Sequence, residues 1–428
     1  MNNTSQGGAI KGNKADGALM VDQGYMQPDT GQRTMQAYGD SKDGESAQVI
    51  IVAGEASADL YGSMLVRTVN GLAPDVNFCG IGGKKMERAG VRIFFSSAEM
   101  AVVGLTEIIS KSGTIRKALR RLKALLKSDR PRLLILIDYP GFNLHLARHA
   151  RRLGIPVLYY ISPQVWAWRR NRVKKIARRV DRLAVILPFE KQFFRSTDLA
   201  VDYVGHPLMD TPLPVADKAT MTVELGIREK RTIIGLLPGS RKEEICNLLP
   251  VMVESAELLK TKVPNLACVL PLAETIDRKL VTPYIEKTSV EIAIVPGDTY
   301  KALSVCSAAM VTSGTATLET AIMGVPMVVV YRASPLSYWV AKRVVKVPYI
   351  SLVNLVGGKE VVRELIQDEV TSERLSEEVF RLLDDSKSRE AMVGDLNEIR
   401  RDLGEGGATL RTARIALDML GRKPAPPG

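Results

Sequence analysis

The chain has 428 residues, 46% of them hydrophobic, which suggests about two domains that each bury a core. Its formal net charge is +12, its four cysteines are scattered without a metal-binding spacing, and its longest apolar runs are strand-sized. These features exclude a disulfide framework, a cysteine-based zinc site and a membrane-spanning helix, and they fit the reducing cytoplasm.

Residues 1–46 differ in composition from the rest of the chain. They are rich in Gly, Gln, Asp and Ser, carry six acids and four bases, and show no periodic apolar positions. Without an apolar core region they resemble neither a signal peptide nor a transit peptide. We expect a disordered N-terminal extension, to which no role is assigned.

Residues 47–208 alternate between strand and helix patterns. The expected strands are QVIIVAG, PRLLILID, IPVLYYIS, DRLAVILP and VDYVG, and the helices between them include EASADLYGSMLVRTV and FNLHLARHARRLG. Alternation of this kind predicts a parallel sheet with right-handed crossovers. We therefore expect a Rossmann-like domain here.

Residues 209–428 repeat the same rhythm after the proline-rich link HPLMDTPLPVAD. The expected strands are RTIIGLLPG, NLACVLPL, EIAIVPG, AAMVTSG and VPMVVVYR. This pattern predicts a second Rossmann-like domain. Two doubly wound α/β domains joined by a linker place a ligand cleft at the carboxyl ends of their strands.

Two loops of the first domain are candidates for the site. Gly54 and Ser57 follow the first strand, where small residues let a ligand approach the backbone and the next helix offers free amides. An ordinary strand–helix turn explains them equally well. Asp138 ends another strand and could act as a general base, because partial burial raises a carboxyl pKa. The alternative is a turn residue that caps the following helix.

Two loops of the second domain favour phosphate binding. Ser240 is expected to cap a helix, with Glu243 at capping-box spacing, and Arg241 offers a two-pronged contact to a diphosphate. In the other loop Ser313, Gly314 and Thr315 stand where a strand ends and a helix begins, so their amides and hydroxyls could hold phosphate oxygens. Glu319, one turn inside that helix, could instead accept hydrogen bonds from sugar hydroxyls. The alternatives are a solvated arginine at Arg241 and an ordinary surface glutamate at Glu319.

Positive charge is concentrated in one part of the chain. Residues 101–182 hold 20 Lys and Arg against four acids, a net charge of +16. Within them, residues 111–127 combine a helical apolar stripe with a cationic face, which is typical of a helix on anionic lipid. The cationic positions are Arg116, Lys117, Arg120, Arg121 and Lys123. A solvated face is one alternative, and single-stranded nucleic acid stacked on Trp166 and Trp168 is another.

Several motifs, taken in order, resemble one family. GEASADLYG, the Asp138 loop, SPQVWAWR, LPFE, VGHP, LLPGSR, SGTATLE and SLVNLVGG follow one another from about Val49 to the C-terminal region. Together they resemble lipid-A-disaccharide synthase, a glycosyltransferase family of the lipopolysaccharide pathway. Each motif alone would be weak, but the combination is specific.

The resemblance implies an α/β GT-B fold, with two Rossmann-like domains facing a central cleft, and inverting chemistry without a metal or a cofactor. Residues 47–208 would hold the acceptor and face the membrane, and residues 209–428 would bind the UDP-sugar and end in helices that cross back or swap. The donor would be UDP-2,3-diacylglucosamine and the acceptor 2,3-diacylglucosamine 1-phosphate (lipid X), giving β-1,6-linked lipid A disaccharide 1-phosphate and UDP. Asp138 would be the general base, Arg241 would bind the diphosphate, and Glu319 and Asn354 would contact nucleotide or sugar.

The same resemblance implies a cytoplasmic protein attached peripherally to the anionic inner membrane, with no nucleic-acid partner, and a homodimer formed by exchanging C-terminal segments.

One position departs from the family pattern. Many members carry an acid two residues before the asparagine of the Asp138 loop, where this chain has Gly141. Any supporting charge at that place is absent.

Two other functions remain open from the residues. The chain could be another UDP-sugar enzyme of the GT-B type, either a lipid-II-type transferase or a UDP-sugar 2-epimerase. An epimerase acts on soluble UDP-sugars and would not need the cationic helix. A basic nucleic-acid-binding module would retain RNA with a steep salt dependence and would release no UDP.

Overall fold

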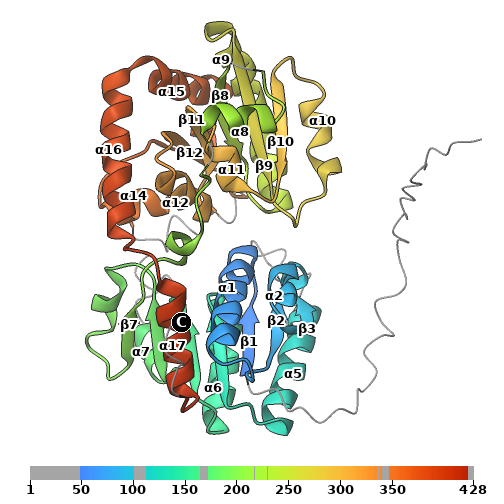
Figure 1. The fold of residues 1–428 in the computed structure, drawn as a ribbon, viewed down its shortest axis with the longest axis vertical. Helices are drawn as coiled ribbons and strands as arrows, with labels where there is room; N and C mark the ends of the chain where they lie inside the picture. The colour runs from blue at the N-terminus through green and yellow to red at the C-terminus, as the bar shows by residue number, and fades with distance from the viewer. Residues whose placement is uncertain are drawn as a thin grey trace, which may run out of the picture. The chain divides into compact units, whose positions relative to one another are not determined.

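Two parallel β-sheets, each flanked by helices, make up the part of the chain that the structure describes (Figure 1). The structure is a computed structural model, and it describes residues 49–100, 112–163, 172–215, 217–228, 230–334, 338–339 and 347–422. The expected N-terminal extension and the segment with Trp166 and Trp168 lie outside these ranges. Both sheets belong to one compact unit, Ser46–Gly428.

The first sheet has seven strands in the order β3-β2-β1-β4-β5-β6-β7, and all its neighbouring pairs are parallel. The strands are β1 (Val49–Ala53), β2 (Phe78–Gly82), β3 (Arg92–Ser96), β4 (Leu133–Ile137), β5 (Val157–Tyr160), β6 (Arg182–Val185) and β7 (Ala200–Tyr203). The expected parallel α/β class is confirmed, although the sequence pattern does not predict β2 and β3.

The second sheet has six strands in the order β10-β9-β8-β11-β12-β13, again with parallel pairs. The strands are β8 (Thr232–Leu237), β9 (Leu266–Leu272), β10 (Glu291–Pro296), β11 (Ala308–Thr312), β12 (Met327–Tyr331) and β13 (Glu364–Ile366). The strand patterns of the second half are confirmed for β8 to β12, and β13 is an additional short edge strand.

Helices connect the strands on both faces of each sheet. The helices that belong to the first sheet are α1 (Ala56–Leu72), α2 (Lys84–Arg88), α3 (Ser97–Met100), α5 (Ser112–Ser128), α6 (Pro140–Arg152) and α7 (Arg172–Ala177). The helices that belong to the second sheet are α8 (Lys218–Glu224), α9 (Lys242–Lys262), α10 (Thr282–Ile285), α11 (Thr299–Leu303), α12 (Thr315–Ile322), α14 (Leu352–Gly357), α15 (Ser372–Asp384) and α16 (Ser386–Asp402). Short 3-10 helices occupy Glu190–Phe194, Pro207–Asp210, Arg278–Leu280 and Gln367–Glu369.

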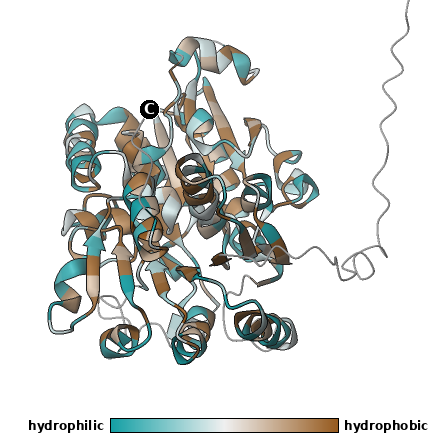
Figure 2. Ribbon diagram, turned by 60° about the horizontal axis from the view of Figure 1, so that its bottom comes forward, coloured by the Kyte–Doolittle hydropathy of each residue, from teal (hydrophilic) through white to brown (hydrophobic). Residues whose placement is uncertain are grey.

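The strands are apolar because helices cover both of their faces. In β1, Val49, Ile51 and Ala53 join the core under α1, whereas Ile50 and Val52 join the core under α5 and α6. Figure 2 shows that the helices around the sheets carry both hydrophilic and hydrophobic residues. Continuous apolar runs such as LLILI are therefore the expected signature of these central strands.

The strand order places the loops with the candidate site residues side by side in each sheet. In each sheet the chain moves outward from its first strand and then returns to the other side of it, so β1 lies beside β4 and β8 lies beside β11. Between such strands the following helices diverge and leave a crevice at the carboxyl ends. The crevices are bordered by the Gly54 and Asp138 loops in one sheet and by the Arg241 and Ser313 loops in the other.

The last helix, α17 (Ala408–Met419), returns from the second sheet to the first and packs on α1 (Figure 1). Asp210, in the link between the sheets, accepts hydrogen bonds from the backbone amides of Gly407, Ala408 and Thr409 at the start of this helix. At its other end Asp418 forms an ion pair with Arg182 of β6. The chain therefore crosses between the two sheets twice, and the crossings are bonded to each other.

Candidate active site

Asp138 stands directly after β4 in an unusual backbone conformation. Asp138 and Tyr139 have φ values of 45° and 46°, in the left-handed region that residues with side chains rarely adopt. The side chain of Asn143 donates to the Asp138 carbonyl at 2.7 Å, and the Tyr159 hydroxyl donates to the same oxygen. Such strain persists only where surrounding groups hold it, and it is concentrated at functional sites.

The Asp138 carboxylate does not cap the helix that follows. The N-cap of α6 is Tyr139, without a side-chain cap, and Pro140 occupies the first turn. The alternative reading of Asp138 as a capping residue is therefore wrong. Burial, and to a smaller extent the carboxylate of Glu55, raise the pKa of Asp138 to about 7, against the opposing effects of a Tyr139 hydrogen bond and the charge of Arg241. A carboxyl of this pKa can exchange a proton near neutral pH.

Residues from both sheets line one cavity beside Asp138. Its polar members are Ser57, Tyr61, Asp138, Ser162, Glu190, His206 and Thr315, and its other lining residues, Leu352 among them, are apolar. Ser57 and Asp138 follow strands of the first sheet, whereas Thr315 and Leu352 begin helices of the second sheet. The structure therefore brings the predicted base and the predicted phosphate-binding loop to the same space.

The start of α12 presents polar groups to this cavity. The amides of a first helical turn have no acceptor within the helix, so those at Thr315 are available for an anion. Gly314 leaves open space where a side chain would stand. The hydroxyl of Ser313, in contrast, donates to the carbonyl of Ile350 at 2.9 Å and so supports the loop. Thr315 is thus better placed than Ser313 to reach a ligand.

Glu319 lies one turn further along α12 and is largely enclosed by protein. Burial raises its pKa to about 7, while the charge of Lys85 opposes the shift. Burial also raises the pKa of Tyr61 well above its usual value, and Glu319 raises it further. Lys85 and Tyr61 belong to α2 and α1, so Glu319 faces groups carried by the first sheet. This position suits the expected contact with sugar hydroxyls.

Arg241 already has two carboxylate partners. One guanidinium nitrogen lies 2.7 Å from Glu55, after β1, and the other lies 3.0 Å from Glu244, in the first turn of α9. Glu244 also accepts from the amides of Ser240 and Arg241. The expected cap by Ser240 with Glu243 is therefore wrong by one residue, since Arg241 is the N-cap and Glu244 closes the turn. A diphosphate at Arg241 would share the guanidinium group with these two carboxylates.

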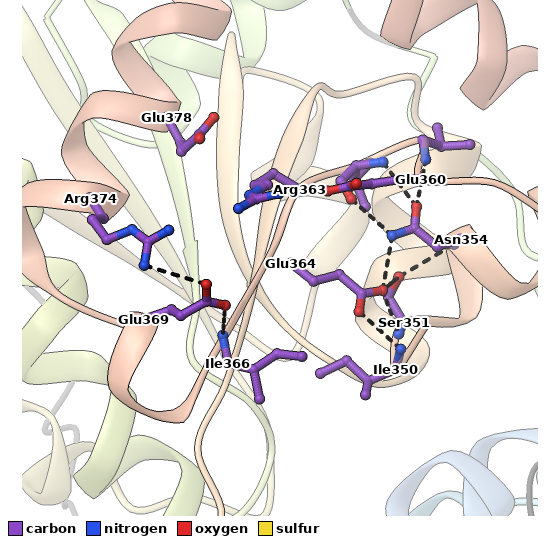
Figure 3. Close-up of polar contacts among 12 residues, drawn as sticks. Ile350, Ser351, Asn354, Glu360, Arg363, Glu364, Ile366, Glu369, Arg374 and Glu378 are labelled. Carbon is purple, nitrogen blue, oxygen red and sulfur yellow. Dashed lines mark hydrogen bonds and ion pairs between the residues drawn. The ribbon is translucent and has the colours of Figure 1, made fainter. Parts of the chain in front are cut away.

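Asn354 lies in a buried network of its own (Figure 3). Its side-chain amide donates to the carbonyl of Val362 at 2.8 Å and to Glu364 at 2.9 Å, and its oxygen accepts from the amides of Val361 and Val362. Glu364 in turn accepts from the backbone and hydroxyl of Ser351. Because all four hydrogen-bonding positions of Asn354 are occupied, the expected substrate contact has no free atom in this conformation. The geometry gives Asn354 a structural role.

Two glycines near Asp138 have different surroundings. At Gly54 a β-carbon would lie 2.6 Å from the Tyr139 ring, so the missing side chain makes room for that ring. Packing against Tyr139 is therefore a second reason for a glycine at position 54, besides the expected approach of a ligand to the backbone. At Gly141 nothing lies within 4 Å of the same position, and the residue is exposed. An acid there would fit without any rearrangement.

The cationic helix α5 uses its apolar side for the core. Ala118, Leu122 and Leu126 are completely buried, and Ile115 and Leu119 pack against the same cluster. The expectation that this apolar stripe receives a membrane is therefore wrong. Arg116, Lys117, Arg120 and Arg121 are exposed, and Lys123 is half-buried. Any contact of α5 with lipid headgroups would be electrostatic.

Sequence reasoning missed several groups of the site. Glu55 and Tyr61 lie in the quoted GEASADLYG stretch, and only their position after a central strand could have pointed to them. Glu190 belongs to LPFE and is almost completely buried, at 2% exposure; a charged residue close to a proline in a loop is the signal that could have found it. His206, in VGHP, is different, because its place beside the link between the sheets predicts a hinge or substrate role, and it is equally buried.

Within the described ranges, no group of three or more His, Cys, Asp or Glu side chains could hold a metal ion. A scan of the same ranges also finds no helix with the length and hydropathy needed to cross a bilayer.

Comparison with known proteins identifies the family. A family model described as lipid-A-disaccharide synthetase matches residues 49–416. The lipid-A-disaccharide synthase of Geobacter metallireducens is 48% identical over 376 residues, which cover 88% of this chain and 98% of that protein. The corresponding protein of Coxiella burnetii strain Dugway is 38% identical and covers 87% and 98%.

Solved structures at 14% identity share the fold. The UDP-GlcNAc 2-epimerase of Neisseria meningitidis bound to UDP-GlcNAc has a TM-score of 0.59, covering 86% of this chain and 99% of that one. The calicheamicin glycosyltransferase has a TM-score of 0.55, with coverage of 88% and 99%. These likenesses confirm the GT-B arrangement. Since the family model spans nearly all of the chain after residue 48, the chain belongs to the lipid-A-disaccharide synthase family.

Proposed function

We propose that this protein transfers 2,3-diacylglucosamine from its UDP derivative to the 6-hydroxyl of 2,3-diacylglucosamine 1-phosphate, and so forms the disaccharide 1-phosphate of lipid A and UDP. The observation that carries this proposal is the shared cavity: a carboxylate of raised pKa, Asp138, faces the helix start at Thr315. An alcohol on the first sheet can thereby meet a departing diphosphate on the second.

The reaction follows from these positions. The acceptor hydroxyl attacks the anomeric carbon of the donor, its oxygen–carbon bond forms as the bond to the diphosphate breaks, and the hydroxyl proton passes to Asp138. Attack from the side opposite the leaving group inverts the anomeric carbon. UDP departs with its negative charge stabilised by the amides at the start of α12 and by Arg241. Glu319 accepts hydrogen bonds from the sugar hydroxyls of the donor.

The fold alone does not separate a transferase from an epimerase. Both occur among the solved structures with this architecture. The proposal for the transferase relies on the family match over residues 49–416 and on relatives of 38–48% identity that carry this activity in their names. An epimerase needs no second substrate, so the two functions differ in what the protein consumes.

The surface around α5 supports attachment to the cytoplasmic face of the anionic inner membrane, where the acylated substrates reside. Beside α5, helix α6 adds three exposed arginines, Arg148, Arg151 and Arg152. A cationic surface of this kind is attracted to anionic headgroups, by about 1 kcal/mol for each Lys or Arg close to the membrane. A homodimer formed by exchanging α17 between two copies would preserve the contact of α17 with α1.

The decisive experiment supplies purified protein with UDP-2,3-diacylglucosamine and lipid X in detergent. We expect stoichiometric UDP and a disaccharide 1-phosphate, detected by coupled assay and mass spectrometry. Parallel reactions without lipid X, and with UDP-N-acetylglucosamine alone followed by NMR, serve as controls. Conversion of UDP-N-acetylglucosamine to its 2-epimer, without disaccharide from the complete mixture, would establish the epimerase instead.

A further inference from the structure

His206 is an unusual member of the cavity wall. It precedes the short helix Pro207–Asp210 in the link between the two sheets, and it is only 2% exposed. Its ring meets that of Tyr61 edge-on, with centroids 6.1 Å apart. It lines the same cavity as Asp138 and Thr315, yet nothing in the reaction described above uses it.

Its hydrogen bonding fixes which ring nitrogen carries the proton. The backbone amide of Leu208 lies 3.2 Å from Nδ1 and donates to it, so Nδ1 must be unprotonated. In a neutral imidazole the proton then resides on Nε2. Burial lowers the pKa of His206 to about 3, with Asp210 opposing the shift, so the ring stays neutral at physiological pH. Among the residues that the structure describes, no protein group accepts a hydrogen bond from Nε2.

We propose that the Nε2–H of His206 donates a hydrogen bond to an uncharged oxygen of the sugar carried by the bound nucleotide, a ring hydroxyl or an acyl carbonyl. The proposal deepens the proposed function and rests on it, because it assigns a sugar-positioning residue to the same cavity. On the wall of this cavity the Nε2–H has no protein acceptor among the described residues, and a ligand oxygen would supply one.

The surroundings favour a neutral oxygen over a phosphate. The imidazole carries no charge, and Ile161, Ile186 and Leu187 of the cavity wall are apolar. Phosphate oxygens are better served by the helix amides at Thr315 and by the guanidinium of Arg241. Because His206 lines the cavity that Asp138 and Thr315 also line, the sugar of a nucleotide bound there is the group that would meet its ring.

Two substitutions distinguish the role of Nδ1 from the role of Nε2. In His206→Asn the side-chain oxygen can still accept from Leu208, but the donor toward the cavity is lost. In His206→Gln the amide can reproduce the donor, but the contact with Leu208 is lost. The full chain of each variant is titrated calorimetrically with UDP and with UDP-N-acetylglucosamine, and thermal melting follows folding.

We expect His206→Asn to weaken UDP-N-acetylglucosamine binding about tenfold, the worth of one buried hydrogen bond, with UDP affinity unchanged within twofold. His206→Gln should bind both ligands nearly as the natural chain does and should melt at a lower temperature. An equal loss for both ligands in His206→Asn would overturn the proposal in favour of a phosphate contact. No loss for either ligand would overturn it outright.

A measurement on the unmodified protein keeps the proposal testable if a variant fails to fold. The chain has three histidines, so nitrogen-15 labelling of histidine gives few ring signals, and subtraction with His145 and His149 variants assigns them. The Nε2 signal of His206 should move with UDP-N-acetylglucosamine and stay in place with UDP. Failure of the natural chain to bind UDP at all would instead contradict the proposed function, and an unmoved Nε2 signal with UDP-sugar bound would contradict only the role of His206.

Discussion

At the scale of single residues, Asp138 shows how position produces chemistry. The left-handed turn after β4 points its carboxylate into the cavity, away from the helix it would otherwise cap. Burial and the neighbouring Glu55 then hold its pKa near 7, where a carboxylate is basic enough to take a proton from a hydroxyl in the transition state. The same residue in solvent would be a much weaker base.

Asp138→Asn should therefore reduce turnover by about 10²- to 10⁴-fold, the usual contribution of a general base. Only the carboxylate form is active, so kcat/KM of the natural chain should rise with pH and level off above about 7. The variant should lose this rising limb, because an amide does not titrate. Steady-state rates between pH 5 and 9 test both statements. UDP affinity should stay constant, and full activity would refute the assignment of the base.

Gly141 offers a test of how the loop tolerates the acid that this chain lacks. It lies in the first turn of α6, exposed and with open space around its α-carbon. Gly141→Asp should raise the free energy of unfolding by roughly 0.5–1 kcal/mol, because glycine is a poor helix former and a negative charge suits a helix N-terminus. Urea unfolding measures the gain. Gly141→Ala separates the propensity effect from the charge, and a destabilised aspartate variant would contradict this reading.

At the scale of elements, the network of Glu364 and Asn354 fastens β13 to the start of α14. The carboxylate of Glu364 binds the amides of Ile350 and Ser351, and so fixes the segment that ends in Leu352 at the cavity. The hydroxyl of Ser313 reaches the same segment from the end of β11. The loop at the cavity thus depends on a polar network within the second sheet and its helices.

Asn354→Asp should lower the free energy of unfolding by roughly 2–4 kcal/mol. The substitution removes both amide donors and places a second carboxyl beside Glu364 in a buried position, where an unpaired charge is costly. The urea midpoint of the folded–unfolded transition reports the change. Asn397→Asp, on the exposed side of α16, provides a matched control that should be nearly neutral. Unchanged stability with lost UDP affinity would show instead that Asn354 contacts the substrate.

Helix α5 carries the charge that the membrane proposal needs. Neutralising Arg116, Lys117, Arg120 and Arg121 to glutamine should reduce binding to vesicles with anionic phosphatidylglycerol by at least tenfold at low salt, without lowering the melting temperature, because these side chains are exposed. Co-sedimentation of the protein with these vesicles across a series of salt concentrations measures the loss of binding. The same change at Lys387, Arg389, Arg400 and Arg401 of α16 controls for total charge. Undiminished binding would remove α5 from the membrane surface.

The elements differ in how far the sequence could predict them. Central strands such as β1 and β4 are continuous apolar runs because helices cover both faces, so they are readily recognised. Strand β2 contains glycines, and at Gly80 a β-carbon would lie 1.9 Å from the carbonyl oxygen of Ile51, so its sequence lacks the usual side chains. Strand β13 has only three residues. For α5, the amphipathic pattern is real, but the pattern does not say whether core or lipid receives the apolar side.

At the scale of the whole molecule, the site exists only because two sheets meet. Motif order could predict Asp138 and the Thr315 loop as partners, since each follows a strand beside a switch in strand order. The ion pair between Glu55 and Arg241 could not be predicted, because the two residues are far apart in the sequence and belong to different sheets. A second ion pair, Arg88 with Glu274 at 3.9 Å, also joins the sheets but is more exposed.

The Glu55–Arg241 pair should oppose nucleotide binding, because the Glu55 carboxylate neutralises part of the guanidinium charge and repels a diphosphate bound beside it. We therefore expect Glu55→Gln to bind UDP about three- to tenfold more tightly, in line with the ~1 kcal/mol of a partly exposed ion pair, whereas Arg241→Ala should bind it more weakly. Since Glu55 also raises the pKa of Asp138, the rising limb of kcat/KM in Glu55→Gln should move to lower pH. Calorimetric titration with UDP and pH–rate profiles measure the two effects. As a control, Glu274→Gln removes the other ion pair and should change neither the UDP affinity nor the pH dependence of kcat/KM. If Glu55→Gln bound UDP no more tightly than the natural chain, Glu55 would not oppose nucleotide binding.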